Sequence, residues 1–513
     1  MPVLRKQLTE GTRLSGLAQP NAGTMSTRLS STRFLIAFAL VALVVCSAPV
    51  FGTRFLNDMD FYSLFADKLL TGRLLYRDAM DTKPPLVFLH YALVFKLFGT
   101  DNVTAVKLVT MAWLGLSALV MVALRKALSP PSAMPALVAP LFILSSFSGW
   151  GEDFLSSNTE VLANLFILVG VWFLVLRTFT YRPLCLFVGG CSIGLACLYR
   201  YQSGAALLAY AGTIVLRPNE LDRKIVRLVL VFSGTALPAL LFVAYYARIG
   251  ALADLKLLLV YQAHYARDAD PFSATIVLGR VASALSGLWP LVLLAVRRTI
   301  AILRDSKPTS KGEIFQLLFA AWSAATFCIG GRFFPHYFVQ AIPPLVLLAA
   351  QGLEADRSRS WFKAHAIAIL ATSAALFTAI NGISYWTREN PPPHPDLVAF
   401  VEANTSPTDE VLLWIWQPQL LLEAKRVFAT RLLVNEVLIG RGDSARLQRR
   451  PGLAELWPVY LRDFAAAPPK LVFDAPPGPS AWPLDRFPQL AALLARDYQP
   501  CQLLDGVCVY LRR

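Results

Sequence analysis

Ionisable residues gather in one short stretch of the sequence that lies between two apolar segments. They include Asp58, Asp60, Asp81 and Lys83, and the pair Pro84-Pro85 follows at once. A carboxylate that is partly removed from water at a lipid interface can act as a general base toward a hydroxyl group. A lysine ammonium can bind a phosphate as a compact point charge. Charged side chains beside lipid therefore indicate chemistry at one face of a membrane.

Asp58 is the leading candidate for the base, because it precedes Tyr62 by four residues at the start of a predicted helix. Asp60 is a weaker candidate for the same role. For an isolated aspartate, a helix cap or a solvated position would be the better explanation, but Lys83 in the same stretch weighs against it. Since proline favours an extended residue before it, Asp81 and Lys83 are expected in a defined turn.

Other polar residues stand at the boundaries of later apolar segments. Asn158 and Glu160 begin one such segment, where the helix macrodipole favours a carboxylate, so helix capping is the alternative for Glu160. The remaining candidates are Arg200, Arg332, His336 and Tyr337. Arginine with histidine at an outer membrane surface suits a lipid-linked phosphate. For Arg332 alone, contact with lipid headgroups is an equal alternative.

The composition is that of a polytopic membrane protein. Hydrophobic residues make up 56% of the 513 residues, charged residues only 16%, and the mean hydropathy is +0.52. The net charge of +15 is best explained by cytoplasmic loops rich in Lys and Arg. A nucleic-acid partner is excluded, because no soluble basic domain exists to bind one.

Eleven apolar segments approach the ~20 residues that cross a bilayer. They are 34–51, 103–124, 132–149, 159–177, 183–199, 203–217, 228–247, 274–296, 313–331, 333–353 and 364–385. Basic clusters fall at every second boundary, as expected if those boundaries are cytoplasmic. The shorter run 84–99 carries His90 and Lys96 and is predicted to be a juxtamembrane or half-inserted helix. The expected fold class is a polytopic α-helical membrane protein with about eleven transmembrane helices plus juxtamembrane helices.

This alternation predicts the sidedness of each part. Residues 1–33 form a basic cytoplasmic segment, and residues 34–386 form the membrane domain with its first outer loop at 52–102. All the candidate residues named above then meet the same non-cytoplasmic face, as a shared site requires. The tail, 387–513, lies on that face too.

The tail is predicted to be a small α/β domain. Residues 396–404 and 486–496 have helical patterns, and 411–416, 471–475 and 507–511 have strand patterns. The domain is either a lid or acceptor platform, or a unit that only stabilises the membrane part, and both alternatives stay open at this point.

Two cysteines of the tail differ from the rest. Cys501 and Cys508 flank a predicted hairpin turn, which would bring them within reach of a disulfide. The other cysteines lie in or near apolar segments and have neither the spacing nor the partners of a zinc site. The residues therefore predict no metal site.

The motifs as a set resemble those of bacterial GT-C superfamily glycosyltransferases, in particular the protein mannosyltransferase and aminoarabinose transferase group (glycosyltransferase family 39-like). They are Asp58-x-x-x-Tyr62, Tyr76-Arg77-Asp78, Asp81-x-Lys83-Pro84-Pro85, Asn158-Thr-Glu160, Gly194-Leu-Ala-x-x-x-Arg200 and Arg332-x-x-Pro-His336-Tyr337, in the same order as in that group. Each motif alone is weak, whereas the combination is specific and covers roughly residues 34–355.

The resemblance implies a GT-C fold and a glycosyltransferase that uses a polyprenyl-phosphate sugar on the outer membrane face. It carries the family's essential carboxylate, the base of an inverting displacement, onto Asp58. Lys83 matches the lysine near the donor phosphate, and Glu160 matches a second acidic residue. Met59 and Thr82 depart from the group, where many members have glutamate. These departures leave a divalent metal and the identity of the sugar open.

The resemblance further predicts a bacterial inner-membrane protein with a periplasmic C-terminal domain. Its partners would be the membrane, the lipid-linked sugar phosphate and an acceptor, which is lipid A or lipopolysaccharide core, another glycan or a protein. Two other classes remain as alternatives. A lipid-linked sugar transporter or flippase predicts midplane charges and repeat symmetry, neither of which is evident. A non-catalytic envelope assembly subunit does not need so many charged residues in the first loop.

Overall fold

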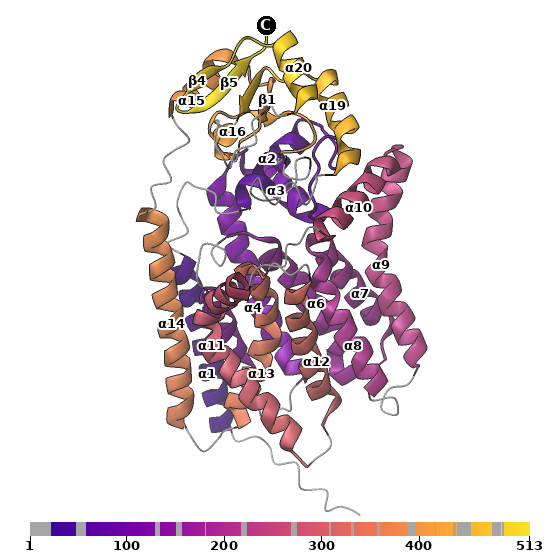
Figure 1. Cartoon of the computed structure of the whole chain (residues 1–513). Coiled ribbons are helices and arrows are strands. Elements are labelled where there is room, and N and C mark those ends of the chain that lie inside the picture. The colour runs from indigo at the N-terminus through magenta and orange to yellow at the C-terminus, as the bar shows by residue number, and fades with distance from the viewer. Residues whose placement is uncertain are drawn as a thin grey trace, which may run out of the picture.

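A computed structural model describes residues 22–47, 58–128, 134–149, 156–179, 181–216, 223–267, 274–306, 309–329, 333–355, 360–387, 395–415, 417–433, 435, 438, 453–474, 484 and 487–513. A bundle of apolar helices forms one part, and a small sheet domain at the C-terminal end caps it (Figure 1). Two helices of the first loop lie between these parts. The prediction of a mostly helical membrane fold with a small C-terminal α/β unit is confirmed.

The bundle consists of helices whose positions follow the predicted apolar segments. They are α1 (Ala22–Ser47), α4 (Val103–Leu128), α5 (Val138–Ser146), α6 (Thr159–Phe179), α7 (Pro183–Tyr199), α8 (Ala205–Leu216), α9 (Lys224–Arg248), α11 (Ala274–Arg304), α12 (Lys311–Ala325), α13 (Ile342–Ala355) and α14 (Ser360–Thr387). Short 3-10 turns extend several of them: η2 (Pro135–Leu137), η4 (Tyr201–Gly204), η6 (Thr326–Cys328) and η7 (Pro335–Ala341).

Six of the described stretches are long and apolar enough to cross a membrane. They are Val103–Leu128, Thr159–Leu176, Lys224–Arg248, Ala274–Arg304, Pro335–Ala355 and His365–Ile383. The described parts of four further apolar helices are shorter, and the predicted number of eleven spans stays a prediction.

The segment predicted at 132–149 forms a shorter helix than expected. Helix α5 has nine residues, all buried, and a 3-10 turn that begins at Pro135 precedes it. Two serine hydroxyls near its end donate to main-chain carbonyls one turn earlier: Ser146 Oγ to Phe142 O at 2.8 Å, and Ser148 Oγ to Leu144 O at 2.6 Å. Such bonds compete with the helical pattern. The rise per residue makes α5 about 14 Å long, which is too short to span a bilayer alone.

Close contact between α7 and α9 depends on glycine. A Cβ at Gly190 would lie 2.3 Å from the carbonyl oxygen of Val231, and a Cβ at Gly234 would lie 2.2 Å from that of Phe187. A side chain at either position would collide with the neighbouring helix, so only glycine allows the two helices to pack this closely. Helix α10 (Leu252–Arg267) follows α9 along the chain and packs against it.

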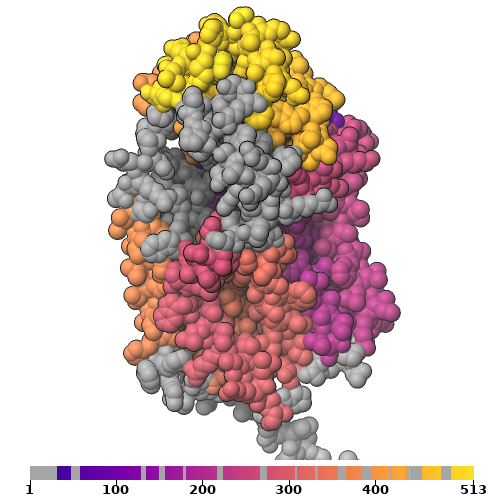
Figure 2. Space-filling model, in the orientation of Figure 1, coloured from indigo at the N-terminus to yellow at the C-terminus, as the bar shows by residue number. Residues whose placement is uncertain are grey.

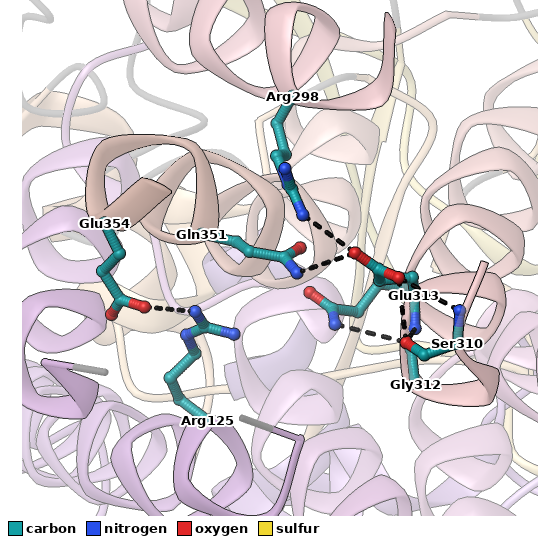
Figure 3. A network of polar contacts seen from close by, with 8 residues as sticks. Arg125, Arg298, Ser310, Gly312, Glu313, Gln351 and Glu354 are labelled. Atoms are coloured by element: carbon teal, nitrogen blue, oxygen red, sulfur yellow. Dashed lines mark hydrogen bonds and ion pairs between the residues drawn. The ribbon is translucent and has the colours of Figure 1, made fainter. Parts of the chain in front are cut away.

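Four helices of the bundle are joined by a polar network (Figure 3). Arg125 of α4 donates to Glu354 of α13 at 2.5 Å, and Arg298 of α11 donates to Glu313 of α12 at 2.8 Å. Glu313 also closes a capping box with Ser310 at the start of α12. The network holds two arginines and two glutamates, so its formal charges balance. It lies at the end of the bundle that the basic clusters predict to be cytoplasmic.

The first loop forms two helices, α2 (Met59–Leu70) and α3 (Pro85–Phe98). Proline at the first position starts α3, because its fixed φ suits a helix and its missing N–H is not needed there. The predicted juxtamembrane helix at 84–99 is therefore present, between the bundle and the C-terminal domain (Figure 1). Helix α10 was not predicted, since its sequence mixes charged and apolar residues.

The C-terminal domain contains a five-stranded sheet in the order β2-β1-β3-β5-β4. The strands are β1 (Glu410–Leu413), β2 (Val427–Phe428), β3 (Leu471–Asp474), β4 (Gln502–Leu504) and β5 (Val507–Leu511). The first three are parallel and the last two antiparallel to their neighbours. Its helices are α15 (Pro395–Asn404), α16 (Gln419–Glu423), α19 (Trp457–Ala466, after the turn η8, Ala454–Leu456) and α20 (Pro488–Asp497). In the space-filling view this domain forms one end of the molecule (Figure 2).

Three strands and two helices of this domain lie where the sequence predicts them. The strand expected at 411–416 ends at Leu413, although the N–H of Trp414 still donates to Phe473 O. A disulfide joins Cys501 and Cys508, whose Cα atoms are 5.5 Å apart. The predicted hairpin turn lies between them: Asp505 and Gly506 both have positive φ, which suits a two-residue turn.

Candidate active site

Asp58 lies immediately before α2 and points toward Lys83. Nζ of Lys83 is 2.7 Å from Oδ2 of Asp58, and the hydroxyl of Tyr62 donates to the same oxygen at 3.3 Å. Asp58 occupies the N-cap position, but its side chain makes no capping hydrogen bond. The carboxylate is therefore held by side chains rather than by the start of its own helix.

Lys83 is held by the turn that precedes α3. Its N–H donates to Oδ1 of Asp81 at 2.8 Å, and its carbonyl accepts from the hydroxyl of Tyr76 at 2.8 Å. Its ammonium lies 4.9 Å from the centre of the Tyr62 ring. Pro84 continues the chain in an extended conformation, as expected for residues beside proline. The predicted turn at Asp81 and Lys83 is confirmed.

The electrostatics of the pair favour its charged form. Burial alone would raise the pKa of Asp58, but the charges of Lys83 and His336 bring it below the ordinary 3.8. Burial alone would lower the pKa of Lys83, but Asp58, Tyr62 and Asp81 raise it well above 10.5. The side chain of Lys83 is 30% exposed and that of Asp58 is 34% exposed, so a ligand can reach both.

A second cluster lies beside this pair and contains Glu160, Arg200, His336 and Tyr337. Glu160, in the first turn of α6, is 1% exposed and forms an ion pair with Arg200, which follows the last residue of α7. Nε2 of His336 is 3.8 Å from Oε1 of Glu160. The guanidinium of Arg200 stacks 4.1 Å from the centre of the Tyr337 ring. The charge of His336 also lowers the pKa of Asp58, which couples the two clusters electrostatically.

Some candidate residues contact groups other than the Asp58–Lys83 pair. Asp60 is 3% exposed and accepts a hydrogen bond from Gln419 of the C-terminal domain. Asn158 is buried just before α6, where its carbonyl accepts from the N–H of Leu162. Arg332 lies outside the described residues. Asp60 is thus buried and hydrogen-bonded to the C-terminal domain, which makes it a weaker candidate for the base than the exposed Asp58.

Several residues of the site were not predicted. Tyr91 packs 5.3 Å from Tyr62, ring centre to ring centre, and donates to the carbonyl of Ser157 at 3.1 Å. Gln262 of α10 donates to the carbonyl of Thr82 at 3.0 Å. Tyr91 sits in an apolar helical pattern and Gln262 in an unpredicted helix, so neither gives a signal in the sequence. Within the described ranges, no group of three or more His, Cys, Asp or Glu residues is placed to hold a metal ion.

The dolichyl-phosphate-mannose-protein mannosyltransferase family matches residues 82–246, which include Lys83, Glu160 and Arg200. Asp58 lies before the matched segment. No curated protein matches the chain in sequence.

Solved structures match almost the whole chain in fold at low sequence identity. ArnT from Cupriavidus metallidurans bound to undecaprenyl phosphate is 15% identical with a TM-score of 0.64, over 93% of this chain and 98% of that chain. The apo state of the same protein is 14% identical with a TM-score of 0.58, over 94% and 98%.

The archaeal oligosaccharyltransferase AglB from Archaeoglobus fulgidus, in complex with an inhibitory peptide and a dolichol-phosphate, is also similar. It is 14% identical with a TM-score of 0.52, over 88% of this chain and 70% of that chain. Identities this low show a shared fold, and the family model matches about a third of the chain. Together they support a GT-C superfamily membrane glycosyltransferase.

Proposed function

We propose that the protein transfers a sugar from a polyprenyl-phosphate donor to an acceptor of the bacterial cell envelope. The observation that carries the proposal is the accessible Asp58–Lys83 pair, which stands beside the buried Glu160–Arg200 pair and His336. A base and a set of cations are the two requirements of this reaction.

The transfer follows from these positions as an inverting displacement. The acceptor hydroxyl attacks the anomeric carbon, and its proton passes to the Asp58 carboxylate. The bond between the anomeric carbon and the phosphate oxygen breaks, and the phosphate leaves with the electron pair. Lys83 and His336 neutralise the charge that develops on this leaving group. Partial exclusion of water strengthens both interactions.

Lys83 serves both sides of this reaction in turn. In the structure its ammonium contacts Asp58, and this contact lowers the pKa of that carboxylate. When the donor phosphate enters, it competes for the same ammonium, and Asp58 loses part of the interaction that lowers its pKa. The Asp58 carboxylate therefore becomes a stronger base when the donor is bound. In the empty site, the contact with Lys83 keeps Asp58 a weaker base.

Glu160 is proposed to position other groups rather than to accept a proton. It is 1% exposed and paired with Arg200, so an acceptor hydroxyl has no access to it. Its charge holds the guanidinium of Arg200 against Tyr337 and faces Nε2 of His336. Glu160 thus orders the cationic side of the site.

The relatives support the donor class and leave the acceptor open. One ArnT structure contains undecaprenyl phosphate, and the AglB structure contains a dolichol-phosphate and a peptide. We propose a hexosyl or pentosyl transfer to lipid A or lipopolysaccharide core, another glycan or a protein. The Cys501–Cys508 disulfide supports a periplasmic position for the C-terminal domain of an inner-membrane protein, since such bonds persist in oxidising compartments.

Transfer by the purified protein tests this function. The full chain, reconstituted with undecaprenyl-phosphate hexose or pentose and an envelope extract, should release undecaprenyl phosphate and label an acceptor. Asp58→Asn should lower the rate by roughly 10²- to 10⁴-fold. Normal rates from both Asp58→Asn and Lys83→Ala would refute the proposed roles, and movement of the donor across vesicles without transfer would indicate a flippase instead.

A further inference from the structure

Lys68, at the far end of α2 from Asp58, is buried against the C-terminal domain. Only 2% of its surface is exposed. Its ammonium donates to the carbonyls of Phe428 at 2.7 Å and Thr430 at 2.5 Å, and it lies 4.1 Å from the centre of the Phe428 ring. A buried ammonium is costly unless hydrogen bonds satisfy it. Lys68 therefore marks a fixed contact between the first loop and the C-terminal domain.

Residues 428–431 of the domain also contact a second part of the first loop, the segment between α2 and α3. The N–H of Met80 donates to the carbonyl of Arg431 at 2.7 Å. The guanidinium of Arg431 makes two bonds with Asp463, at 2.6 and 3.0 Å, and lies 3.6 Å from Asp254 of α10. We call residues 428–431 the docking strip. It joins α2, the turn before α3 and α10 at one place.

These contacts reach close to both members of the Asp58–Lys83 pair. Asp60, two residues after Asp58, accepts from Gln419 of α16. Met80, which bonds to the docking strip, is three residues before Lys83. Asp58 and Lys83 thus each lie within three residues of a hydrogen bond to the C-terminal domain.

We propose that the C-terminal domain is a fixed clamp that sets the distance between Asp58 and Lys83, with Lys68 and Gln419 as positioning residues. A lid that opens at this interface would have to expose the ammonium of Lys68 and the carboxylate of Asp60, each 3% exposed or less. The catalytic consequence of the clamp rests on the proposed function, but its existence does not.

Hydrogen exchange of the full-length protein tests the clamp without any assay of activity. Lys68→Met removes the donors and keeps the apolar stem, so peptides from 59–70 and 72–83 should exchange at least about tenfold faster. Peptides from β3 and β5 should stay protected, which separates undocking from unfolding. Lys68→Arg should restore most of the protection. Arg73→Ala is the matched control, because Arg73 pairs with Glu410 at the same interface but is 47% exposed. Unchanged exchange in Lys68→Met would overturn the proposal.

A cross-link separates a clamp from a lid. Arg73→Cys and Glu410→Cys, in a Cys328→Ser background, can be joined by a short bis-maleimide, since their native side chains meet at 2.9 Å. The cross-linked protein should transfer sugar as fast as the unlinked one, and a loss of transfer on cross-linking would overturn the clamp.

Kinetics complete the test. Lys68→Met and Gln419→Ala should lower kcat by about 10- to 100-fold, because a small displacement of a catalytic group has effects of this size, while KM for the donor changes less. An equal effect on both constants, or none, would contradict the positioning role. If the wild-type protein transfers no sugar, the proposed function fails and the exchange result still decides the clamp.

Discussion

Nζ of Lys83 lies 2.7 Å from Oδ2 of Asp58, although the two residues are 25 positions apart and precede different helices. The contact joins the proposed base to the proposed phosphate ligand before any substrate is present. It implies that the two functions are coupled, since a bound phosphate would share with Asp58 the single positive charge of this ammonium.

Substitution of Lys83 should separate its two effects. Lys83→Met removes a phosphate contact and should raise KM for the donor, and it should also lower kcat because the leaving phosphate is less well neutralised. Lys83→Arg keeps the charge but not the compact geometry and should recover only part of the activity. Steady-state kinetics with varied donor concentration measure both constants. An unchanged kcat/KM in Lys83→Met would contradict the assigned role.

The pH dependence of transfer should report the pKa of Asp58. In the free enzyme this pKa is below 3.8, so the base stays ionised as the pH falls toward that value, and the acidic limb of kcat/KM should lie below it. The Asp58–Lys83 pair contributes to stability over a similar pH range. Its contribution is fully present above pH 3.8, the ordinary pKa, and is lost as the pH falls through the lowered pKa of Asp58.

Removal of Lys83 should move the acidic limb upward. Burial raises the pKa of Asp58, and without the lysine charge this effect is opposed mainly by His336. Lys83→Met should therefore retain its residual activity only at higher pH than the wild-type protein. A profile that does not move would show that Asp58 is not the titrating base.

Loss of one member of the Glu160–Arg200 pair should destabilise the protein more than loss of both members. Arg200→Gln leaves the carboxylate of Glu160 buried at 1% exposure with a weaker partner, which should cost about 3–5 kcal/mol. The double variant Glu160→Gln with Arg200→Gln removes both charges and should regain much of this loss. Thermal unfolding in detergent measures the difference. A double variant less stable than either single variant would contradict the argument.

The balanced network at the opposite end of the bundle offers a contrasting prediction. Arg125 is 2% exposed and pairs with Glu354, so Arg125→Met should destabilise the protein by about 3 kcal/mol. Because Arg125 lies in the last turn of α4, at the opposite end of this helix from the first loop that precedes it, transfer below the unfolding temperature should be unchanged. A lowered kcat with unchanged stability would assign the network a different role.

The sequence predicts the helices of the bundle better than it predicts which charges meet. Apolar length places α7 at its observed bounds, and the double proline places the turn at Lys83. The pairing of Glu160 with Arg200 depends on how α6 and α7 pack, and no local pattern contains that information. Asp58 and Asp60 look alike in sequence, and the hydrogen bond that Asp60 accepts comes from Gln419, far along the chain.

The bonds of Lys68 have a consequence for how the protein is made. They join residues that are 360 and 362 positions apart, between the first loop and the C-terminal domain. At the usual rate of synthesis, roughly 20 to 70 s separate the appearance of Lys68 from that of its partners. The first loop therefore cannot make these contacts until nearly all of the chain has been translated. If the proposed clamp is required for transfer, a chain that stops before residue 428 carries every proposed catalytic residue without the contacts that position Asp58 and Lys83.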